Sequence, residues 1–414
     1  MTHKHIRYRF RFTKEMLRLP SSIKLLSFVI FVYYLGWGIV TPYFPLYLKT
    51  LFKDYTTIGL ITGMLPLIAI FTYLILGPLI DRISKKKVIT LSLLLYAPFS
   101  IILLGMSTVL QFFYFRIYHA IIASSLWISS DSYLREHAPK NRKSESIGLF
   151  DSFYTLSLVI GPIIGAFLII RYSFNILYAI SIFAFLAFLF SFLLHDKKGM
   201  SLSKGLKAVF VKDHFIKKEL SDFWSNKMLV KFSLFMFLFY FATSFIGLVI
   251  PLILQSFGTD LFKIGLLSAL FNLPLISESY FSTLKKKKTS VIFGLLFAAA
   301  LSLLMFMSKD VFIFGILIFL LGLSIVAVIP IIQGRLTELM PKKEIGELVG
   351  VNSSIWNIAS GFGPIVGGII ADKLGLNYTF LLAFIIFSVL LLIAVLSKSF
   401  YFKEEKIIDG VAKV

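Results

Sequence analysis

Residues 138–165 read APKNRKSESIGLFDSFYTLSLVIGPIIG, and they recur 202 residues later, at 340–367, as MPKKEIGELVGVNSSIWNIASGFGPIVG. Pro139 matches Pro341, and Gly161-Pro162-Ile163 matches Gly363-Pro364-Ile365. Earlier residues align at an offset of 206, where Ile58-Gly59-Leu60 matches Ile264-Gly265-Leu266. So many identities at nearly constant spacing indicate two copies of one half, and the functional site is expected between them.

The composition predicts a membrane protein. The chain has 414 residues, of which 58% are hydrophobic, and a mean hydropathy of +0.88. Soluble domains contain about 45–50% apolar residues, so a bilayer is the expected solvent. The basic N-terminus has no apolar core followed by a small-residue cleavage site, which argues against a signal peptide. Because cysteine is absent, disulfides and thiolate metal sites are excluded.

Twelve apolar runs are long enough to cross a membrane, which takes about 20 residues. They lie at 24–48, 56–80, 88–107, 110–132, 147–170, 174–194, 229–254, 262–283, 289–307, 311–334, 346–371 and 377–397. The expected fold is an all-α membrane protein with twelve transmembrane helices in two pseudo-symmetric six-helix bundles. The bundles are expected at 1–194 and 229–414, joined by a cytoplasmic linker at 195–228 that acts as a tether.

The distribution of Lys and Arg predicts the orientation. Of 42 such residues, 35 fall in the N-terminus, the C-terminus and the loops on the same side, and six fall on the opposite side. The positive-inside rule therefore places both termini in the cytoplasm, in a protein of the plasma membrane. The same sorting explains the net charge of +21 without nucleic-acid binding.

Four stretches resemble motifs of the major facilitator superfamily (MFS), and of its drug and sugar proton-coupled permeases. Residues 77–87, GPLIDRISKKK, are similar to the G-x-x-x-D-R-x-G-R-K loop between spans 2 and 3. Arg116 stands where the family has R-x-x-Q-G in span 4. Residues 148–166 resemble the span 5 motif with G-P, and residues 335–338 with Gly350 and Gly363-Pro364 resemble its second-half counterpart.

The resemblance implies a central cavity lined by spans 1, 4, 7 and 10, with alternating access by rocking of the bundles. It also implies a cytoplasmic gate formed by Asp81, Arg82 and Gly77, in which Asp81 pairs with cations or a helix N-terminus of the other half. The alternative is that the basic residues of this loop only set the membrane topology, and that Asp81 is simply an acidic residue in the turn. The second half has no D-R at the counterpart loop, so the gate is one-sided. The helix-packing residues are expected to be Gly161, Pro162, Gly165, Gly363, Pro364 and Gly367.

Ionisable groups inside spans are candidate functional residues. Arg116 and His119 lie one turn apart on one face of span 4, where Arg116 binds an anionic group, gates protons or snorkels. Glu278 in span 8 carries protons, pairs with nearby lysines or packs in its bundle. Asp131 and Asp151 are expected to form interfacial ion pairs with cations of the loop between spans 4 and 5. The remaining candidates for substrate contact are Trp37, Tyr34, Tyr240, Asn272, Gln333 and Asn357.

The function predicted from these features is secondary active transport of a small organic solute, coupled to protons and directed outward. A proton-coupled uptake permease for a sugar or organic acid, and a non-transporting receptor or scramblase, are the alternatives. Neither H-E-x-x-H nor a P-loop occurs, so no enzyme and no direct use of ATP is expected. No cofactor or metal is predicted, the partners are the solute, protons and lipid, and the protein is expected to be a monomer.

Overall fold

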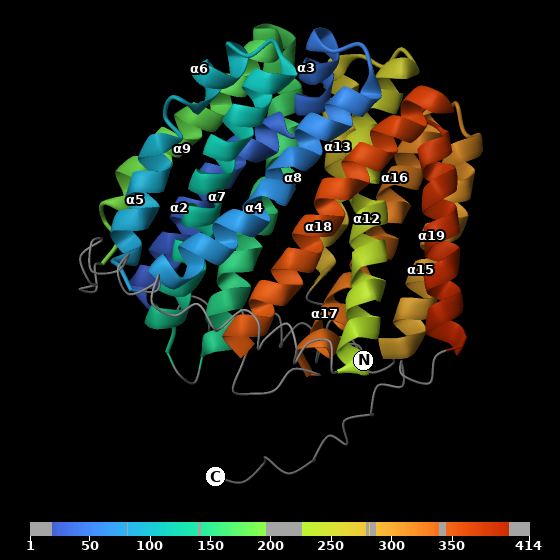
Figure 1. Ribbon diagram of the computed structural model, residues 1–414. Helices are drawn as coiled ribbons and strands as arrows, with labels where there is room; N and C mark the ends of the chain where they lie inside the picture. Colours follow the sequence, from blue (N-terminus) through green and yellow to red (C-terminus); the bar gives the residue numbers. More distant parts are fainter. Residues whose placement is uncertain are drawn as a thin grey trace, which may run out of the picture.

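Helices form both halves of the computed structural model, which describes residues 19–80, 82–139, 142–195, 226–278, 281, 287–338 and 345–396 (Figure 1). The first bundle consists of α2 (Ser21–Val40), α3 (Phe44–Leu51), α4 (Tyr55–Ile80), α5 (Lys85–Leu95), α6 (Phe99–Leu104), α7 (Val109–His137), α8 (Lys143–Tyr172), η1 (Ser173–Leu177) and α9 (Tyr178–Ser191). The second consists of α12 (Lys227–Ser256), α13 (Leu261–Asn272), η2 (Leu273–Ser277), α15 (Lys287–Met307), α16 (Val311–Val326), α17 (Ile329–Glu338), α18 (Ile345–Lys373) and α19 (Tyr378–Leu396). The expected linker at 195–228 lies almost wholly outside the described residues.

The helices provide twelve crossings of the bilayer. Among the described residues, ten helical segments are long and apolar enough to span a membrane. One of them, Glu145–Ser191, has 47 residues and contains two crossings, α8 and α9. The shorter apolar segment Leu261–Ser277 accounts for the twelfth crossing. The chain therefore has the predicted architecture of two six-helix bundles.

Several predicted spans are not continuous helices. The span expected at 88–107 is divided into α5 and α6, because Pro98 has no N–H to continue the helix. Beside this break, the backbone oxygen of Tyr96 accepts hydrogen bonds from the N–H of Phe99 at 3.1 Å and from Ser181 Oγ at 3.2 Å. The span expected at 24–48 is likewise divided, at Thr41-Pro42-Tyr43 between α2 and α3.

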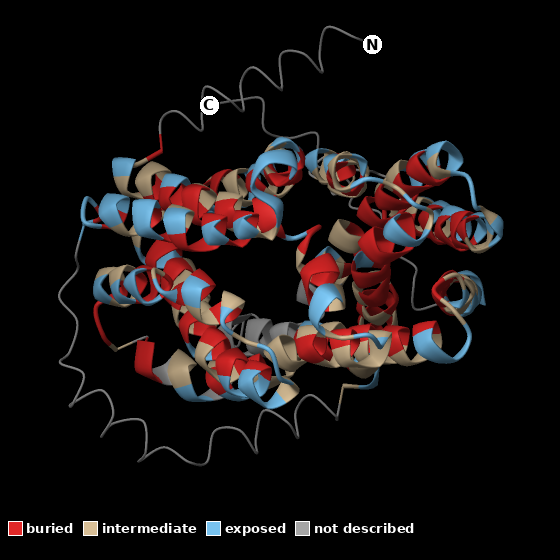
Figure 2. Ribbon diagram, turned by 90° about the horizontal axis from the view of Figure 1, so that it is seen from above, coloured by how far each residue is buried: buried red, intermediate tan, exposed pale blue. Residues whose placement is uncertain are grey.

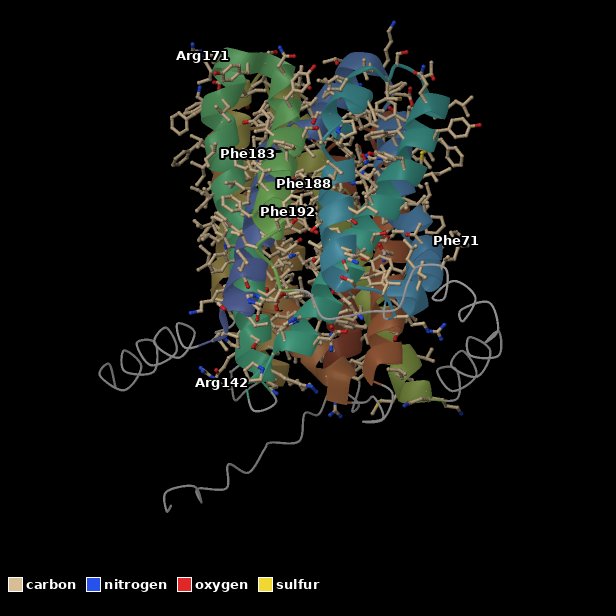
Figure 3. All side chains as sticks on the ribbon, turned by 90° about the vertical axis from the view of Figure 1, so that its left-hand side faces the viewer. Phe71, Arg142, Arg171, Phe183, Phe188 and Phe192 are labelled. Carbon is tan, nitrogen blue, oxygen red and sulfur yellow. The ribbon has the colours of Figure 1, made fainter. Side chains whose placement is uncertain are left out.

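The molecule has two faces that the membrane separates. We call the terminal face the one where the described chain begins at Leu19 and ends at Leu396, at the bottom of Figure 1. The opposite, distal face carries the loops that contain Asp54, Asp260 and Asp310. Figure 3 shows Arg142 and Arg171 near opposite ends of the molecule, as expected for charged ends on either side of a hydrocarbon layer.

The outer surface between the faces is apolar, as contact with lipid requires. Phe71 is 67% exposed and projects from the side of the molecule in Figure 3. Buried residues gather instead where the helices face one another, as the view along the bundles shows (Figure 2). These apolar side chains on the outer surface are therefore expected to contact lipid instead of water.

The two bundles meet backbone to backbone along α4 and α18. A Cβ added at Gly59 would lie 2.1 Å from the oxygen of Pro364, and one at Gly63 would lie 2.1 Å from the oxygen of Gly361. A Cβ at Gly368 would lie 2.3 Å from the oxygen of Tyr55. We call these glycines (59, 63, 361 and 368) the glycine seam. It occupies the distal part of α4, whereas a Cβ at Gly77, nearer the terminal face, would meet nothing within 4 Å.

The repeated Gly-Pro motifs lie against the first helix of their own bundle. A Cβ at Gly161 would lie 2.5 Å from the backbone of Gly38 in α2. In the second bundle, a Cβ at Gly363 would lie 1.9 Å from Ser244 Oγ of α12. Pro162 and Pro364 stay inside α8 and α18 without ending them. The sequence repeat therefore corresponds to one repeated helix contact, α2 with α8 and α12 with α18.

Candidate functional site

Arg116 and His119 are buried inside the first bundle, at 3% and 2% exposure. Both stand on α7, which begins with a capping box between Thr108 and Gln111. Arg116 Nε donates to the backbone oxygen of Ile61 at 3.0 Å, and its Nη1 lies 3.1 Å from His119 Nδ1. Since a guanidinium only donates, His119 Nδ1 accepts this bond and carries no proton in this arrangement.

The other side of His119 is covered by aromatic rings. Trp37 of α2 stacks on the imidazole, with centroids 5.1 Å apart and an angle of 9° between the planes. Phe99 meets it edge-on at 4.7 Å. Trp37 Nε1 in turn donates to Tyr33 Oη at 2.9 Å. These polar and ring contacts of Arg116 and His119 are therefore to helices of their own bundle, and they join α2, α4 and α7.

A second aromatic group of the first bundle is separate from His119. Tyr34, Trp127 and Tyr154 come from α2, α7 and α8, and we call them the aromatic triad. Tyr34 meets Tyr154 edge-on at 4.6 Å, and Trp127 lies 5.8 Å from Tyr154. All three are half-buried, unlike the fully enclosed His119. Sequence reasoning named Tyr34 as a candidate but missed Tyr154, which stands in the midst of the repeated span 5 motif.

In the second bundle, Gln333 of α17 and Tyr240 of α12 are joined by a hydrogen bond of 2.7 Å, which Gln333 Nε2 donates to Tyr240 Oη. Asn272, at the end of α13, reaches the first bundle, where its Nδ2 donates to the backbone oxygen of Leu158 at 3.4 Å. Asn357 is buried in α18 at 4% exposure. These candidates thus occupy three separate positions.

Glu278 and Asp151 lie at one level on opposite sides of the bundle interface. The contact of Leu158 with Asn272 sets the register of α8 against α13 and η2, which run antiparallel. Asp151 is seven residues from Leu158 towards the terminal face, about 10 Å at 1.5 Å per residue. Glu278 is six residues from Asn272 in the same direction, about 11 Å because η2 rises about 2.0 Å per residue.

The expected ion pairs near the loop between spans 4 and 5 form only in part. Arg135 donates to Asp131 at 2.7 Å, as predicted. Asp151 forms no ion pair in the described part of the chain, so that expectation was wrong. The reason is its position, since Asp151 lies two turns inside α8, beyond the reach of the loop cations.

The predicted cytoplasmic gate is described only at its edges. Asp81 lies outside the described residues. Arg82 is half-buried and Gly77 lies in open space near the end of α4. Nearby, Lys85 forms an ion pair of 2.9 Å with Glu136, which joins α5 to α7 at the terminal face.

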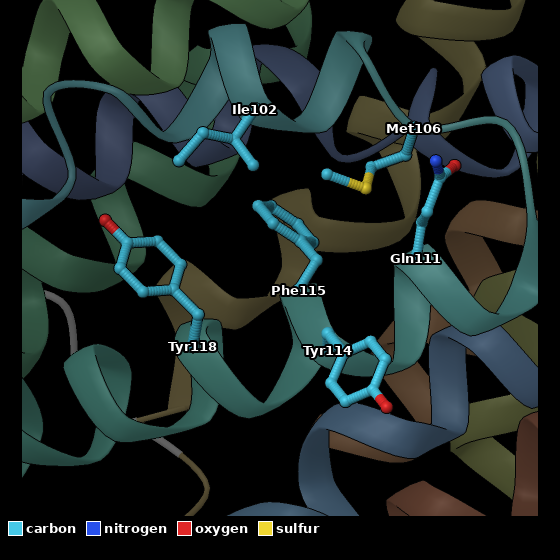
Figure 4. A pocket seen from close by; sticks show the side chains of 6 residues that line it. All are labelled: Ile102, Met106, Gln111, Tyr114, Phe115 and Tyr118. Carbon is cyan, nitrogen blue, oxygen red and sulfur yellow. The ribbon is translucent and has the colours of Figure 1, made fainter.

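A pocket of about 310 Å³ opens on the outside of the first bundle, between α6 and the start of α7. Figure 4 shows its lining, with Phe115 between Ile102 and Met106, and with Gln111, Tyr114 and Tyr118 around it. Tyr114 is 63% exposed. None of the residues predicted to contact a substrate lines this pocket, which opens towards the lipid side.

The chain belongs to the major facilitator superfamily, whose sequence model matches residues 26–283 and 232–407. It is 26% identical over 379 residues to an uncharacterized MFS-type transporter of Methanocaldococcus jannaschii, a match that covers 87% of this chain and 93% of that one. It is 24% identical to multidrug resistance protein 2 of Bacillus subtilis strain 168, over 86% and 89% of the two chains. The crystal structure of the nucleoside transporter NupG has the same fold, with a TM-score of 0.71 at 16% identity, over 93% of this chain and all of that one.

These findings define the class of the protein. It is a secondary transporter of the membrane, it moves small molecules, and it is not an enzyme. The predicted family, fold and transport function are confirmed.

Proposed function

We propose that this chain exports small amphipathic organic cations in exchange for protons. The observation that carries the proposal is the position of Asp151 and Glu278, which lie at the same height on opposite bundles, next to the half-buried aromatic triad. Carboxylates attract a positive charge, and aromatic faces add cation–π attraction together with apolar contact. A solute with a cationic group and an apolar body fits this combination.

The same pair accounts for proton coupling. Two carboxylates at the same height of the bundle interface repel each other as the bundles approach, and either a proton or a cationic solute relieves that repulsion. Because the two ligands act on one pair of charges, binding of one opposes binding of the other, which is the requirement for exchange. Since the carboxylates stand on different bundles, rocking of the bundles changes their separation and hydration.

The outward direction rests on the multidrug resistance relative of Bacillus subtilis and on the polarity of the chain. In the proposed arrangement the terminal face is cytoplasmic, the protein works as a monomer in the plasma membrane, and residues 195–228 tether the two bundles. Asp81, Arg82 and Gly77 close the cytoplasmic side when the distal side opens.

The test uses purified protein in liposomes with the terminal face inside. Tetraphenylphosphonium serves as the probe cation and benzoate as the probe anion. We expect saturable export of the cation that accelerates when the outside is made acidic, and no saturable flux of benzoate. Benzoate flux with no cation flux, or cation flux indifferent to the pH gradient, would contradict the proposal.

Two variants separate binding from coupling. Glu278→Gln is expected to keep exchange of labelled for unlabelled cation but to lose its acceleration by the pH gradient. Asp310→Asn is the matched control, because it neutralises an exposed carboxylate on the distal face that caps its own helix. If Glu278→Gln and His119→Ala both keep the full pH dependence, neither residue carries the proton.

A further inference from the structure

Asp372 of the second bundle caps a helix of the first. Its Oδ1 accepts a hydrogen bond of 2.8 Å from the backbone N–H of Tyr55. Its Oδ2 accepts two more from Thr56, at 2.7 Å from the backbone N–H and 2.6 Å from Oγ1. The first N–H groups of a helix have no partner within it and form its positive end. Asp372 satisfies two of these groups in α4, and Asp54 satisfies that of Thr57.

Other acidic residues of the distal face behave differently. Asp260 accepts from the backbone N–H of Lys263 at 2.9 Å, and Asp310 from that of Ile313 at 2.8 Å. Each of these carboxylates caps the helix that directly follows it in sequence. Asp372 instead stands in the last turn of α18, where the helix dipole disfavours a negative charge. Its favourable partners are all on the other bundle.

The cap lies at the distal end of the glycine seam. A Cβ at Gly368, one turn before Asp372, would already lie 2.3 Å from the oxygen of Tyr55. The carboxylate is held on a single methylene, so it cannot follow α4 if the two helices separate. Separation of the two helices at the seam therefore breaks all three hydrogen bonds together. The Asp372 carboxylate is then left beside the negative, C-terminal end of its own helix.

We propose that Asp372 is the latch of the distal face, which holds the two bundles together in the closed state described here and is released when that face opens. This inference rests on the alternating access of the proposed function, but it names a residue and a contact that transport alone does not require. Loss of the latch shifts the equilibrium between the states towards the one open at the distal face.

The test measures the populations of the two states without solute. The chain contains no cysteine, so spin labels can be attached to introduced cysteines alone. Lys53→Cys with Lys309→Cys reports on the distal face, and Lys87→Cys with Thr289→Cys on the terminal face; all four positions are exposed. Distances within each pair are measured by electron–electron double resonance in lipid nanodiscs.

In this background Asp372→Asn is expected to raise the ratio of distal-open to distal-closed molecules about tenfold, equivalent to about 1.4 kcal/mol. The distal pair moves apart and the terminal pair approaches. Asp310→Asn makes the same chemical change at a carboxylate that caps its own helix, so its distance distributions should match those of the parent. Unchanged distances in Asp372→Asn, or an equal shift in both variants, would overturn the latch.

A second variant covers the case in which Asp372→Asn does not fold. Thr56→Val removes one of the three donors and should shift the same populations by a smaller factor. Thr50→Val is its control, because Thr50 Oγ1 donates only to Tyr47 within α3. No difference between these two variants rejects the latch. A shift in populations without cation transport retains the latch and rejects the proposed exporter, so the two failures are distinguishable.

Discussion

Replacement of Gly161 by alanine tests whether the repeated Gly-Pro motif holds α8 against α2. The added methyl would lie 2.5 Å from both the Cα and the carbonyl carbon of Gly38, and 2.8 Å from the nitrogen of Ile39. Ordinary contact begins near 3.4 Å, so the two helices must move apart by about 0.9 Å. Each neighbouring atom belongs to the backbone and cannot turn aside. Overpacking of this kind costs about 1–3 kcal/mol.

For a bundle of this size, about 1 kcal/mol corresponds to about 2–4 °C in the unfolding temperature. Gly161→Ala should therefore unfold at a temperature lower by about 2–12 °C, followed by intrinsic tryptophan fluorescence of the purified protein on heating. Gly247→Ala is the matched control, since Gly247 is exposed on α12 and an added Cβ would meet nothing within 4 Å. The reasoning fails if Gly161→Ala and Gly247→Ala unfold at the same temperature.

Two further predictions concern charged groups. Arg116→Lys keeps the charge but loses the contacts of the guanidinium with both Ile61 and His119. It should lower the free energy of unfolding by about 1.5–3 kcal/mol and lower the unfolding temperature, whereas Arg171→Lys at an exposed position should change neither. The backbone N–H of Lys263 donates to the Asp260 carboxylate and holds its pKa below the ordinary 3.8. The contribution of the Asp260 carboxylate to stability is therefore complete above about pH 4 and is lost as the pH falls through its lowered pKa. Between pH 5 and pH 3, Asp260→Asn should not show this loss in unfolding temperature.

The fold was largely predictable from the sequence, because the patterns that determine it, long apolar runs and an internal repeat, extend along the whole chain. Apolar runs and the two offsets of 202 and 206 predict twelve spans and two equivalent halves. The breaks within spans were not predictable from proline alone. Pro162 continues its helix, whereas Pro98 begins a new one. At Pro162 the backbone oxygen of Leu158, which has no N–H partner four residues later, accepts a hydrogen bond from Asn272 of the other bundle, a contact that no spacing along the chain reveals.

The candidate site was less predictable, because it depends on how the helices are rotated against one another. The spacing of Arg116 and His119 on one helix correctly placed them together. The stacking of Trp37 on His119 requires the rotation of α2 against α7, which no spacing within one helix contains. Glu278 was recognised as an ionisable group in a span. The approach of Asp151 to it follows only from the register between α8 and η2.

Asp372 is not among the residues predicted from the sequence, although its position carries a signal. An aspartate in the last turn of a helix is unfavourable for that helix, so its presence points to a positive partner elsewhere. The same reasoning applies to Asp81, which directly follows the last residue of α4, Ile80. The helices α4 and α18 run antiparallel along the interface, and the sequence has an aspartate at the C-terminal end of each. The contact described for Asp372 at the distal face is therefore the counterpart of the gate predicted for Asp81 at the terminal face. Because rocking closes one face as it opens the other, the two caps should form alternately, and neutralisation of either should favour the state that the other stabilises.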